Sequence, residues 1–297
     1  MTGAPRSVDV AGAAGDAPLV ADSPVRLSPL VRRVLAPNPS VMTGPGTNTY
    51  LIGSDDVTVI DPGPDDAAHV DAIVAAGTSD GGRITRVVCT HTHIDHWPGA
   101  ADVAARTGAE ILAFGSRDGL EVTGTLGDGD EIVTAEYTLR LLHTPGHASN
   151  HLCVLLVDED FLFTGDHIMQ GVTVVIAAPD GDMSAYMASL DRLANLEPPL
   201  ARIAPAHGHV IDDPAAIIAA YVAHRTAREE LVAAALARVE NTATVDELVP
   251  VVYADVDAAL YPIARLSLWA HLRKLDDEGR ARVDDRDAID TARWSPV

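Results

Sequence analysis

The segment T-H-T-H-I-D-H, which contains His91, His93, Asp95 and His96, constrains this chain more than any other part of the sequence. It directly follows an apolar run at residues 84–90 that predicts a buried strand. Side chains two residues apart in an extended segment face the same way, so the first two histidines can converge on one point. The aspartate and the third histidine, at the following turn, can serve a second point nearby. Imidazole and carboxylate are ligands that Zn²⁺ prefers, and the segment therefore predicts a metal site.

Three further candidate ligands occur in the same sequence context, each after a predicted strand. They are His147 after strand 131–142, Asp166 after strand 160–164 and His207 after strand 201–204. Each is weak evidence alone, because a histidine after a strand usually has a structural role. Their shared placement at strand ends strengthens the prediction of one common site.

Strand-like and helix-like runs alternate through the first two thirds of the chain, which predicts a layered α/β or α+β domain with sheet buried under helices. Residues 48–53 and 57–60 are separated by a short polar turn and predict a β-hairpin. Further strands are expected at 84–90, 110–114, 131–142, 152–157, 160–164 and 201–204, and helices at 65–76, 98–108 and 183–196.

The pattern changes after Asp213. Residues 214–240 predict a long alanine-rich helix with proline at its first position. A second helix is expected at 244–253, where Thr244 and Glu247 have capping-box spacing. A third helix at 258–278 and a small β-hairpin within 280–297 complete the outline of a winged helix.

With these motifs the chain resembles the metallo-β-lactamase superfamily, whose H-x-H-x-D-H signature is matched residue for residue at 91–96. The resemblance implies an αββα sandwich and two zinc ions per chain. It implies that Asp166 bridges the metals, and that Asp61, in V-I-D-P-G, orients the metal loop. The implied ligands are His91, His93 and His147 for the first metal, and Asp95, His96 and His207 for the second.

The resemblance is closest to the lactamase-β-2-like subfamily, which combines a glyoxalase II-like metal site with a C-terminal winged-helix-like domain. It rests on residues 42–51, 143–151, 162–168 and 221–230, and it extends from about residue 25 to the end. It implies a catalytic domain at 25–213 and a helical winged-helix-like domain at 214–297. Residues 1–24, which are rich in Ala, Gly, Pro and Asp, are expected to be a disordered tail on composition alone. Subfamily members often carry an aromatic residue between the first two histidines, where this chain has Thr92.

The implied mechanism is hydrolysis by a hydroxide that bridges the two metals and attacks a carbonyl carbon or a phosphorus atom. Asp95 and Asp166 are then catalytic as well as metal-binding. His151 is a third candidate, able to donate to a substrate or to a developing oxyanion. A hydrogen bond at the start of a strand is an equally good interpretation of that histidine.

Charge separates the possible substrates. The chain has 21 Lys and Arg against 43 Asp and Glu, a formal net charge of −22, and this repels long polyanions. A thioester or ester, small or carrier-borne, is the first expectation. Metal-dependent cleavage of single-stranded RNA is the alternative, with Arg117, Arg225 and Arg228 as a thin candidate track. Residues 222–297 contain ten basic and fourteen acidic side chains, so this module is expected to be a lid or dimer surface rather than a reader of duplex DNA.

The remaining features are typical of a cytoplasmic protein. The sequence contains no run of 18 or more apolar residues, so no membrane span is expected. Residues 1–24 lack the continuous apolar core of a secretory signal. Cys89 and Cys153, the chain's two cysteines, lie in apolar runs and are expected to be inert core thiols. An oligomer is possible.

Overall fold

The computed structural model describes residues 19–297, so most of the stretch expected to be a disordered tail lies outside the described residues. Residues 19–24 of that stretch are ordered against the sandwich. The Asp22 amide donates to the Leu35 carbonyl at 2.8 Å, and the Asp22 carboxylate lies 3.0 Å from Nδ1 of His69. Tertiary contacts of this kind are not visible in a local composition bias.

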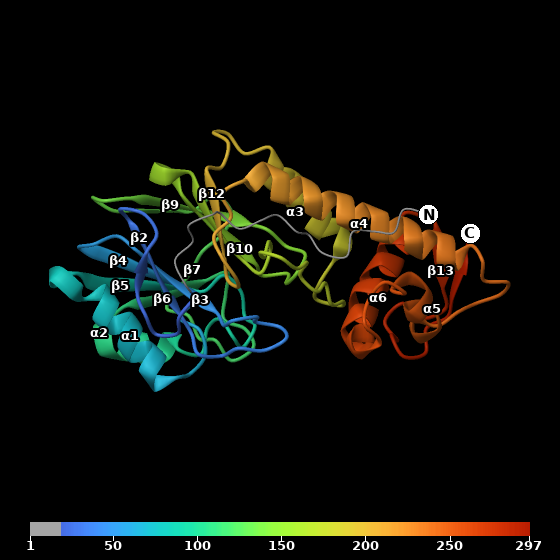
Figure 1. Ribbon diagram of the computed structural model, residues 1–297, viewed down its shortest axis with the longest axis horizontal. Helices are drawn as coiled ribbons and strands as arrows, with labels where there is room; N and C mark the ends of the chain where they lie inside the picture. Colours follow the sequence, from blue (N-terminus) through green and yellow to red (C-terminus); the bar gives the residue numbers. More distant parts are fainter. Residues whose placement is uncertain (1–18) are drawn as a thin grey trace.

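The first sheet has seven strands in sequential order, antiparallel from β1 to β4 and parallel from β4 to β7 (Figure 1). Helices α1 (Ala67–Gly77) and α2 (Ala100–Thr107) cover its outer face through a cluster of aliphatic side chains. The strands are β1 (Val25–Arg26), β2 (Val31–Leu35), β3 (Asn48–Ile52), β4 (Asp56–Ile60), β5 (Arg83–Val88), β6 (Glu110–Ala113) and β7 (Gly124–Thr125).

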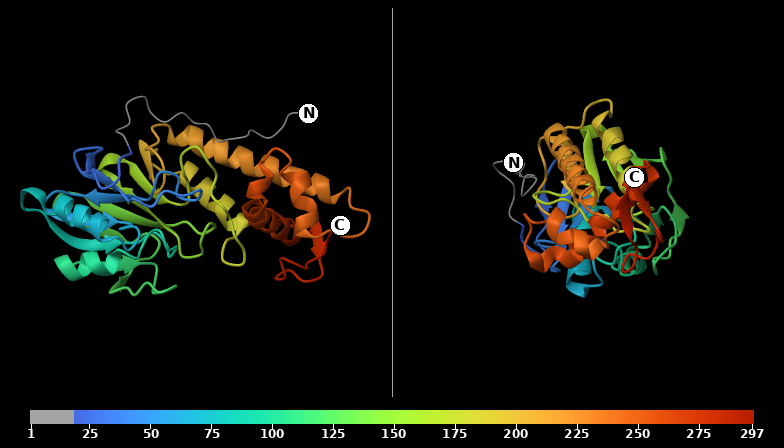
Figure 2. Two further views of the ribbon diagram at one scale, coloured as in Figure 1. Left: turned by 60° about the horizontal axis from the view of Figure 1, so that its bottom comes forward. Right: turned by 90° about the vertical axis from the view of Figure 1, so that its right-hand side faces the viewer.

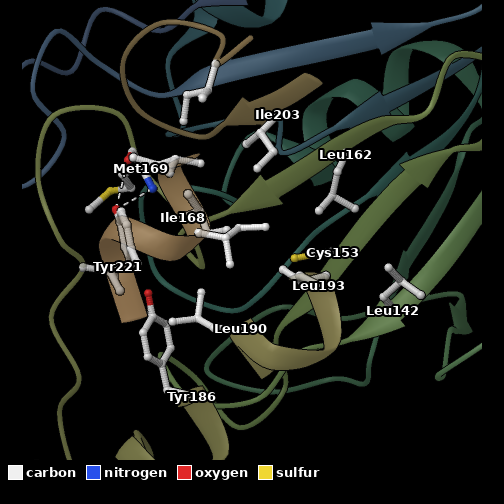
Figure 3. Close-up of a cluster of buried hydrophobic side chains, with 14 of the residues drawn as sticks. Leu142, Cys153, Leu162, Ile168, Met169, Tyr186, Leu190, Leu193, Ile203 and Tyr221 are labelled. Atoms are coloured by element: carbon white, nitrogen blue, oxygen red, sulfur yellow. Dashed lines mark hydrogen bonds between the residues drawn. The ribbon is translucent and has the colours of Figure 1, made fainter. Parts of the chain in front are cut away.

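The second sheet has five strands in the order β12-β11-β10-β9-β8, with α3 (Met183–Ala194) and α4 (Pro214–Leu236) on its outer face. Figure 3 shows the side chains that join these helices to the sheet, including Tyr186, Leu190 and Tyr221. The strands are β8 (Glu131–Val133), β9 (Thr138–His143), β10 (Leu152–Leu156), β11 (Phe161–Gly165) and β12 (Arg202–Pro205). A second cluster, including Tyr50 and Phe163, fills the space between the two sheets.

The predicted αββα sandwich is therefore confirmed, with local differences. The single strand expected at 131–142 is the hairpin β8–β9, because Thr134 Oγ1 accepts the backbone amides of Glu136 and Tyr137 and turns the chain. The sequence did not reveal β2, whose adjacent Arg32 and Arg33 hide its apolar pattern although the strand is buried.

The C-terminal module has the expected winged-helix outline. It contains α5 (Val245–Val252), α6 (Tyr261–Asp277) and a hairpin of β13 (Ala281–Val283) with β14 (Trp294–Pro296). The predicted capping box of Thr244 and Glu247 is present, and a 3₁₀ turn at Ala258–Leu260 precedes α6. The long helix α4 runs from the sandwich into this module, as Figure 2 shows from two further sides.

Two smaller expectations concern cysteine and membranes. Cys89 and Cys153 are both fully buried and free, and burial raises the pKa of both thiols, to about 12 for Cys153. Neither is therefore a ready nucleophile. No helix in the described part of the chain is both long and apolar enough to span a membrane.

Candidate metal centre

The metal loop begins where two neighbouring parallel strands, β4 and β5, end side by side. Asp61 follows β4 with a φ of 49°, a left-handed conformation that aspartate tolerates better than most residues. Its carboxylate accepts the Thr90 amide at 2.7 Å, the Thr90 hydroxyl at 2.8 Å and Nδ1 of His96 at 2.9 Å. Asp61 thus ties the start of the metal loop to one of the histidines within it, as the resemblance implied.

A first group of ligand atoms comes from His91, His93, His147 and Asp166. Nδ1 of His93 lies 3.0 Å from Nε2 of His91 and 2.9 Å from Nε2 of His147. The nearest carboxylate oxygen, Oδ2 of Asp166, is 3.7 Å from Nε2 of His147. Two nitrogens bound to one tetrahedral zinc at 2.0–2.1 Å lie about 3.3 Å apart, so these spacings suit a single cation of that size.

A second group shares Asp166 and adds Asp95, His96 and His207. Oδ1 of Asp166 lies 3.6 Å from Nε2 of His96 and 3.2 Å from Nε2 of His207. Oδ2 of Asp95 lies 3.5 and 3.3 Å from the same two nitrogens. Asp166 therefore turns one oxygen to each group, which is the geometry of a bridging carboxylate. All seven residues that the sequence selected as ligands are brought together.

The ring nitrogen that faces away from the site has a partner in four of the five histidines. A hydrogen bond at Nδ1 keeps the proton there and leaves the lone pair of Nε2 for a metal. The Nδ1 partners are Thr90 Oγ1 for His91 (3.1 Å), Asp61 for His96 (2.9 Å), the Val175 carbonyl for His147 (2.7 Å) and the Gly46 carbonyl for His207 (3.1 Å). Sequence reasoning missed Thr90, Val175 and Gly46, and two of these act through backbone carbonyls, which leave no side-chain signal.

Several ligand atoms lack a hydrogen-bond partner, which also fits a metal site. Nε2 of His96, Nε2 of His207 and Oδ1 of Asp166 are buried and have no hydrogen-bond partner among the described residues. Buried polar atoms are normally paired, and an unpaired one costs free energy. These three converge on one point, and a cation there satisfies all of them.

Electrostatics distinguishes the two groups. Burial lowers the pKa of His91, His93 and His147, to about 4 for His147, so these imidazoles are neutral at pH 7. Burial also opposes protonation of His207, but the negative charges of the nearby Asp166 and Asp95 carboxylates outweigh it and raise the pKa of His207 to about 9. The first group is thus ready to bind a cation at neutral pH, whereas the second must release protons to do so.

His151 lies beside the ligands, but its ring faces groups of the protein. It is fully buried, its Nδ1 lies 3.0 Å from Thr144 Oγ1, and its Nε2 accepts the Asp166 amide at 3.3 Å. Both ring nitrogens of His151 are thus engaged by groups of the protein. The alternative of a structural hydrogen bond fits better, and the histidine supports the bridging aspartate from behind.

Two of the three arginines expected to form a track for RNA are buried. Arg225 and Arg228 are 3% and 2% exposed. Arg225 donates to the Val174 carbonyl, and Arg228 donates to the Val252 carbonyl and to Asp255. Tertiary packing removes these two side chains from the surface, and the sequence pattern did not reveal that packing. Arg117 is partly exposed but is paired with Asp180 at 2.7 Å.

Comparisons with known proteins agree with this geometry. Residues 42–209 match the Metallo-beta-lactamase superfamily, and residues 244–294 match the Beta-lactamase associated winged helix domain. A Beta-lactamase-like protein 2 homolog of Drosophila melanogaster is 34% identical over 87% of this chain and 91% of its own. The atrochrysone carboxyl ACP thioesterase dmxR1 of a Cryptosporiopsis species is 29% identical over 89% and 85%. A beta-lactamase domain protein from Burkholderia ambifaria has a similar fold, with a TM-score of 0.80, 20% identity and coverage of 95% and 96%.

Proposed function

Because this chain belongs to the metallo-beta-lactamase superfamily and is a metal-dependent hydrolase, we propose that it uses two zinc ions to cleave thioesters or esters. The observation that carries the proposal is the pair of ligand groups joined by the two oxygens of Asp166. Two such cations, when bound, activate water for attack and polarise the oxygen of the scissile group.

The residues of this chain supply the metal ligands and hold them in position. The neutral imidazoles of the first group and the carboxylates of the second supply ligands of the kinds zinc prefers. Asp61 and His151 hold the metal loop and the bridging aspartate from within the protein. Neither described cysteine is available as a nucleophile, so hydrolysis proceeds without a covalent thioester on the enzyme.

The surface near the ligands favours an apolar acyl group. Three loops that supply or contact metal ligands each expose a large apolar side chain. These are Met42 in the loop that reaches His207 through Gly46, Ile94 between His93 and Asp95, and Val172 in the segment that reaches His147 through Val175. Ile94 is 71% exposed, so an apolar acyl group that covers it gains free energy by removing apolar surface from water.

Two further observations support an acyl substrate over RNA. The net charge of −22 opposes the approach of a polyanion, and two of the three arginines considered for an RNA track are buried. One relative at 29% identity is named as an acyl-carrier-protein thioesterase.

The decisive experiment compares kcat/KM for a series of acyl thioesters with that for single-stranded RNA, using metal-loaded enzyme across a salt series. We expect thioester turnover to exceed RNA cleavage at physiological salt and to depend little on salt, because the acyl substrate carries little charge. Asp166→Ala controls for contaminating enzymes. Metal-dependent RNA cleavage that is lost in this variant and exceeds turnover of every thioester would establish a ribonuclease instead.

The contribution of Ile94 can be tested separately. Ile94→Asn is expected to raise KM for a butyryl thioester more than for a succinyl thioester, because only the apolar acyl group gains from contact with isoleucine. Val133→Asn is the matched control, since Val133 is 66% exposed on β8, a strand that supplies no ligand. Equal effects of the two substitutions would remove Ile94 from the acyl-binding surface.

A further inference from the structure

The segment at residues 169–178, which follows the bridging aspartate, is held by the two long helices α4 and α6. The Tyr221 hydroxyl on α4 lies 2.9 Å from the Met169 amide, one of the contacts drawn in Figure 3. One turn further along α4, Arg225 donates to the Val174 carbonyl. On α6, Ser267 Oγ accepts the Ile176 amide at 3.4 Å. The backbone is thus fixed at three points along its length.

The residue between the last two of these points contacts a metal ligand. The Val175 carbonyl accepts the Nδ1 proton of His147 at 2.7 Å. The side chains of Val174 and Ile176 are buried, at 2% and 0% exposed, in the cluster between the second sheet and its helices. The segment is therefore anchored by α4, α6 and the core on one side and presents one carbonyl to His147 on the other.

Arg225 has features of a residue placed for this purpose. A buried guanidinium is costly unless its donors are satisfied, because burial removes its hydration. This one is 3% exposed, lies 5.4 Å over the Tyr186 ring and donates to the Val174 carbonyl, and no acidic side chain within residues 19–297 forms an ion pair with it. The backbone of the 169–178 segment is thus its principal hydrogen-bond acceptor.

We propose that Arg225 and Ser267 are positioning residues for the first metal, which act through Val174, Val175 and Ile176 on His147. The carbonyl of Val175 fixes both the orientation of the imidazole and its tautomer, with the proton on Nδ1 and the lone pair of Nε2 facing the site. Through α6, the winged-helix module completes a metal site whose ligands all come from the sandwich. This role concerns metal binding and does not depend on the identity of the substrate.

The chain offers a matched control for Arg225. Arg228 lies three residues along α4, is 2% exposed, and donates to the Val252 carbonyl at 2.6 Å and to Asp255 at 2.9 and 3.1 Å. It also stacks over an aromatic ring, Tyr253, at 4.4 Å. All of these partners belong to the C-terminal module, so loss of Arg228 removes a comparable buried guanidinium without touching the 169–178 segment.

The test uses Arg225→Met, Arg228→Met and Ser267→Ala in the full chain, with the metal removed and Zn²⁺ titrated back against a chromogenic chelator. Loss of an outer hydrogen-bond partner typically lowers metal affinity about 10–100-fold. We expect Arg225→Met to weaken one of the two zinc equivalents by about this factor and Ser267→Ala to weaken the same equivalent by less. Arg228→Met should leave both zinc affinities unchanged, although we expect urea unfolding to show that it, too, lowers stability.

A second readout follows His147 directly. Its hydrogen-bonded Nδ1 proton should give a downfield proton resonance in zinc-loaded protein, assigned by its loss in His147→Ala. We expect this resonance to shift or broaden in Arg225→Met and to stay in Arg228→Met, with partial recovery in Arg225→Lys.

Two results would overturn the proposal: wild-type zinc affinity and an unshifted resonance in Arg225→Met, or equal weakening in Arg225→Met and Arg228→Met, which would indicate general destabilisation. Should Arg225→Met not fold, Ser267→Ala and Arg225→Lys decide by the same two measurements.

Discussion

Asp61→Asn tests how the metal loop is held, because asparagine keeps the shape of the side chain and tolerates the left-handed backbone. The amide oxygen can still accept the Thr90 amide. The new NH₂ group then faces Nδ1 of His96. In the native protein this nitrogen donates to Oδ2 of Asp61 at 2.9 Å, so two donors would face each other. To avoid this conflict His96 must rotate or carry its proton on Nε2, the atom that a metal needs.

The expected magnitude follows from these contacts. A hydrogen bond to a charged group contributes roughly 1.5–3 kcal/mol to stability, and Asp61 accepts three such bonds while 2% exposed. Loss of the partner of a metal-binding histidine lowers affinity about 10–100-fold, which is about 1.4–2.8 kcal/mol. We therefore expect Asp61→Asn to weaken the zinc held by the second ligand group by that factor and to retain the first.

The assay is a two-step zinc titration against a chelator, combined with urea unfolding of the metal-free protein. Asp22→Asn is the matched control, because Asp22 also has a left-handed φ, 54°, and also contacts a buried histidine, His69, at 3.0 Å. The control should lose some stability and keep both zinc affinities. Wild-type affinity for both zinc ions in Asp61→Asn would refute the orienting role.

Three further outcomes are expected. Asp166→Ala should lose two-metal occupancy by elemental analysis together with turnover, and full activity with two metals would contradict the bridge. Burial alone would raise the pKa of Glu229, but hydrogen bonds from its neighbours lower this pKa to about 2. The ionised carboxylate therefore contributes up to about 3 kcal/mol to the free energy of unfolding above pH 4.5, and this contribution is lost as the pH falls towards 2. Glu229→Gln should therefore lower stability at pH 7 and flatten this acid dependence in urea unfolding. Gly146→Ala should cost about 3 kcal/mol in the same assay, since an added Cβ would lie 2.4 Å from the backbone of α3. Gly129→Ala should cost less, because it shares the strain of a positive φ but has open space around the added Cβ.

Much of the metal site followed from the sequence because its spacing is local. His91 and His93 face one way since they are two residues apart after a strand, and the strand ends at His147, Asp166 and His207 could be recognised from apolar runs. The division of these ligands between two metals came from the family resemblance. The capping box at Thr244 could also be read directly, since its partners are three residues apart.

Other features depended on neighbours that are distant in sequence, and no local pattern reports them. His151 is close to ligands along the chain, but packing buries it and directs its Nε2 to the backbone amide of Asp166. From the sequence alone, Arg225 and Arg228 were expected on an exposed basic face of a helix. Both are buried because α6 and the 169–178 segment pack against α4. The sequence by itself determined which side chains can bind metal. The tertiary structure decided which groups hold those side chains, because burial and hydrogen bonding arise from contacts between elements rather than from the order of residues within one.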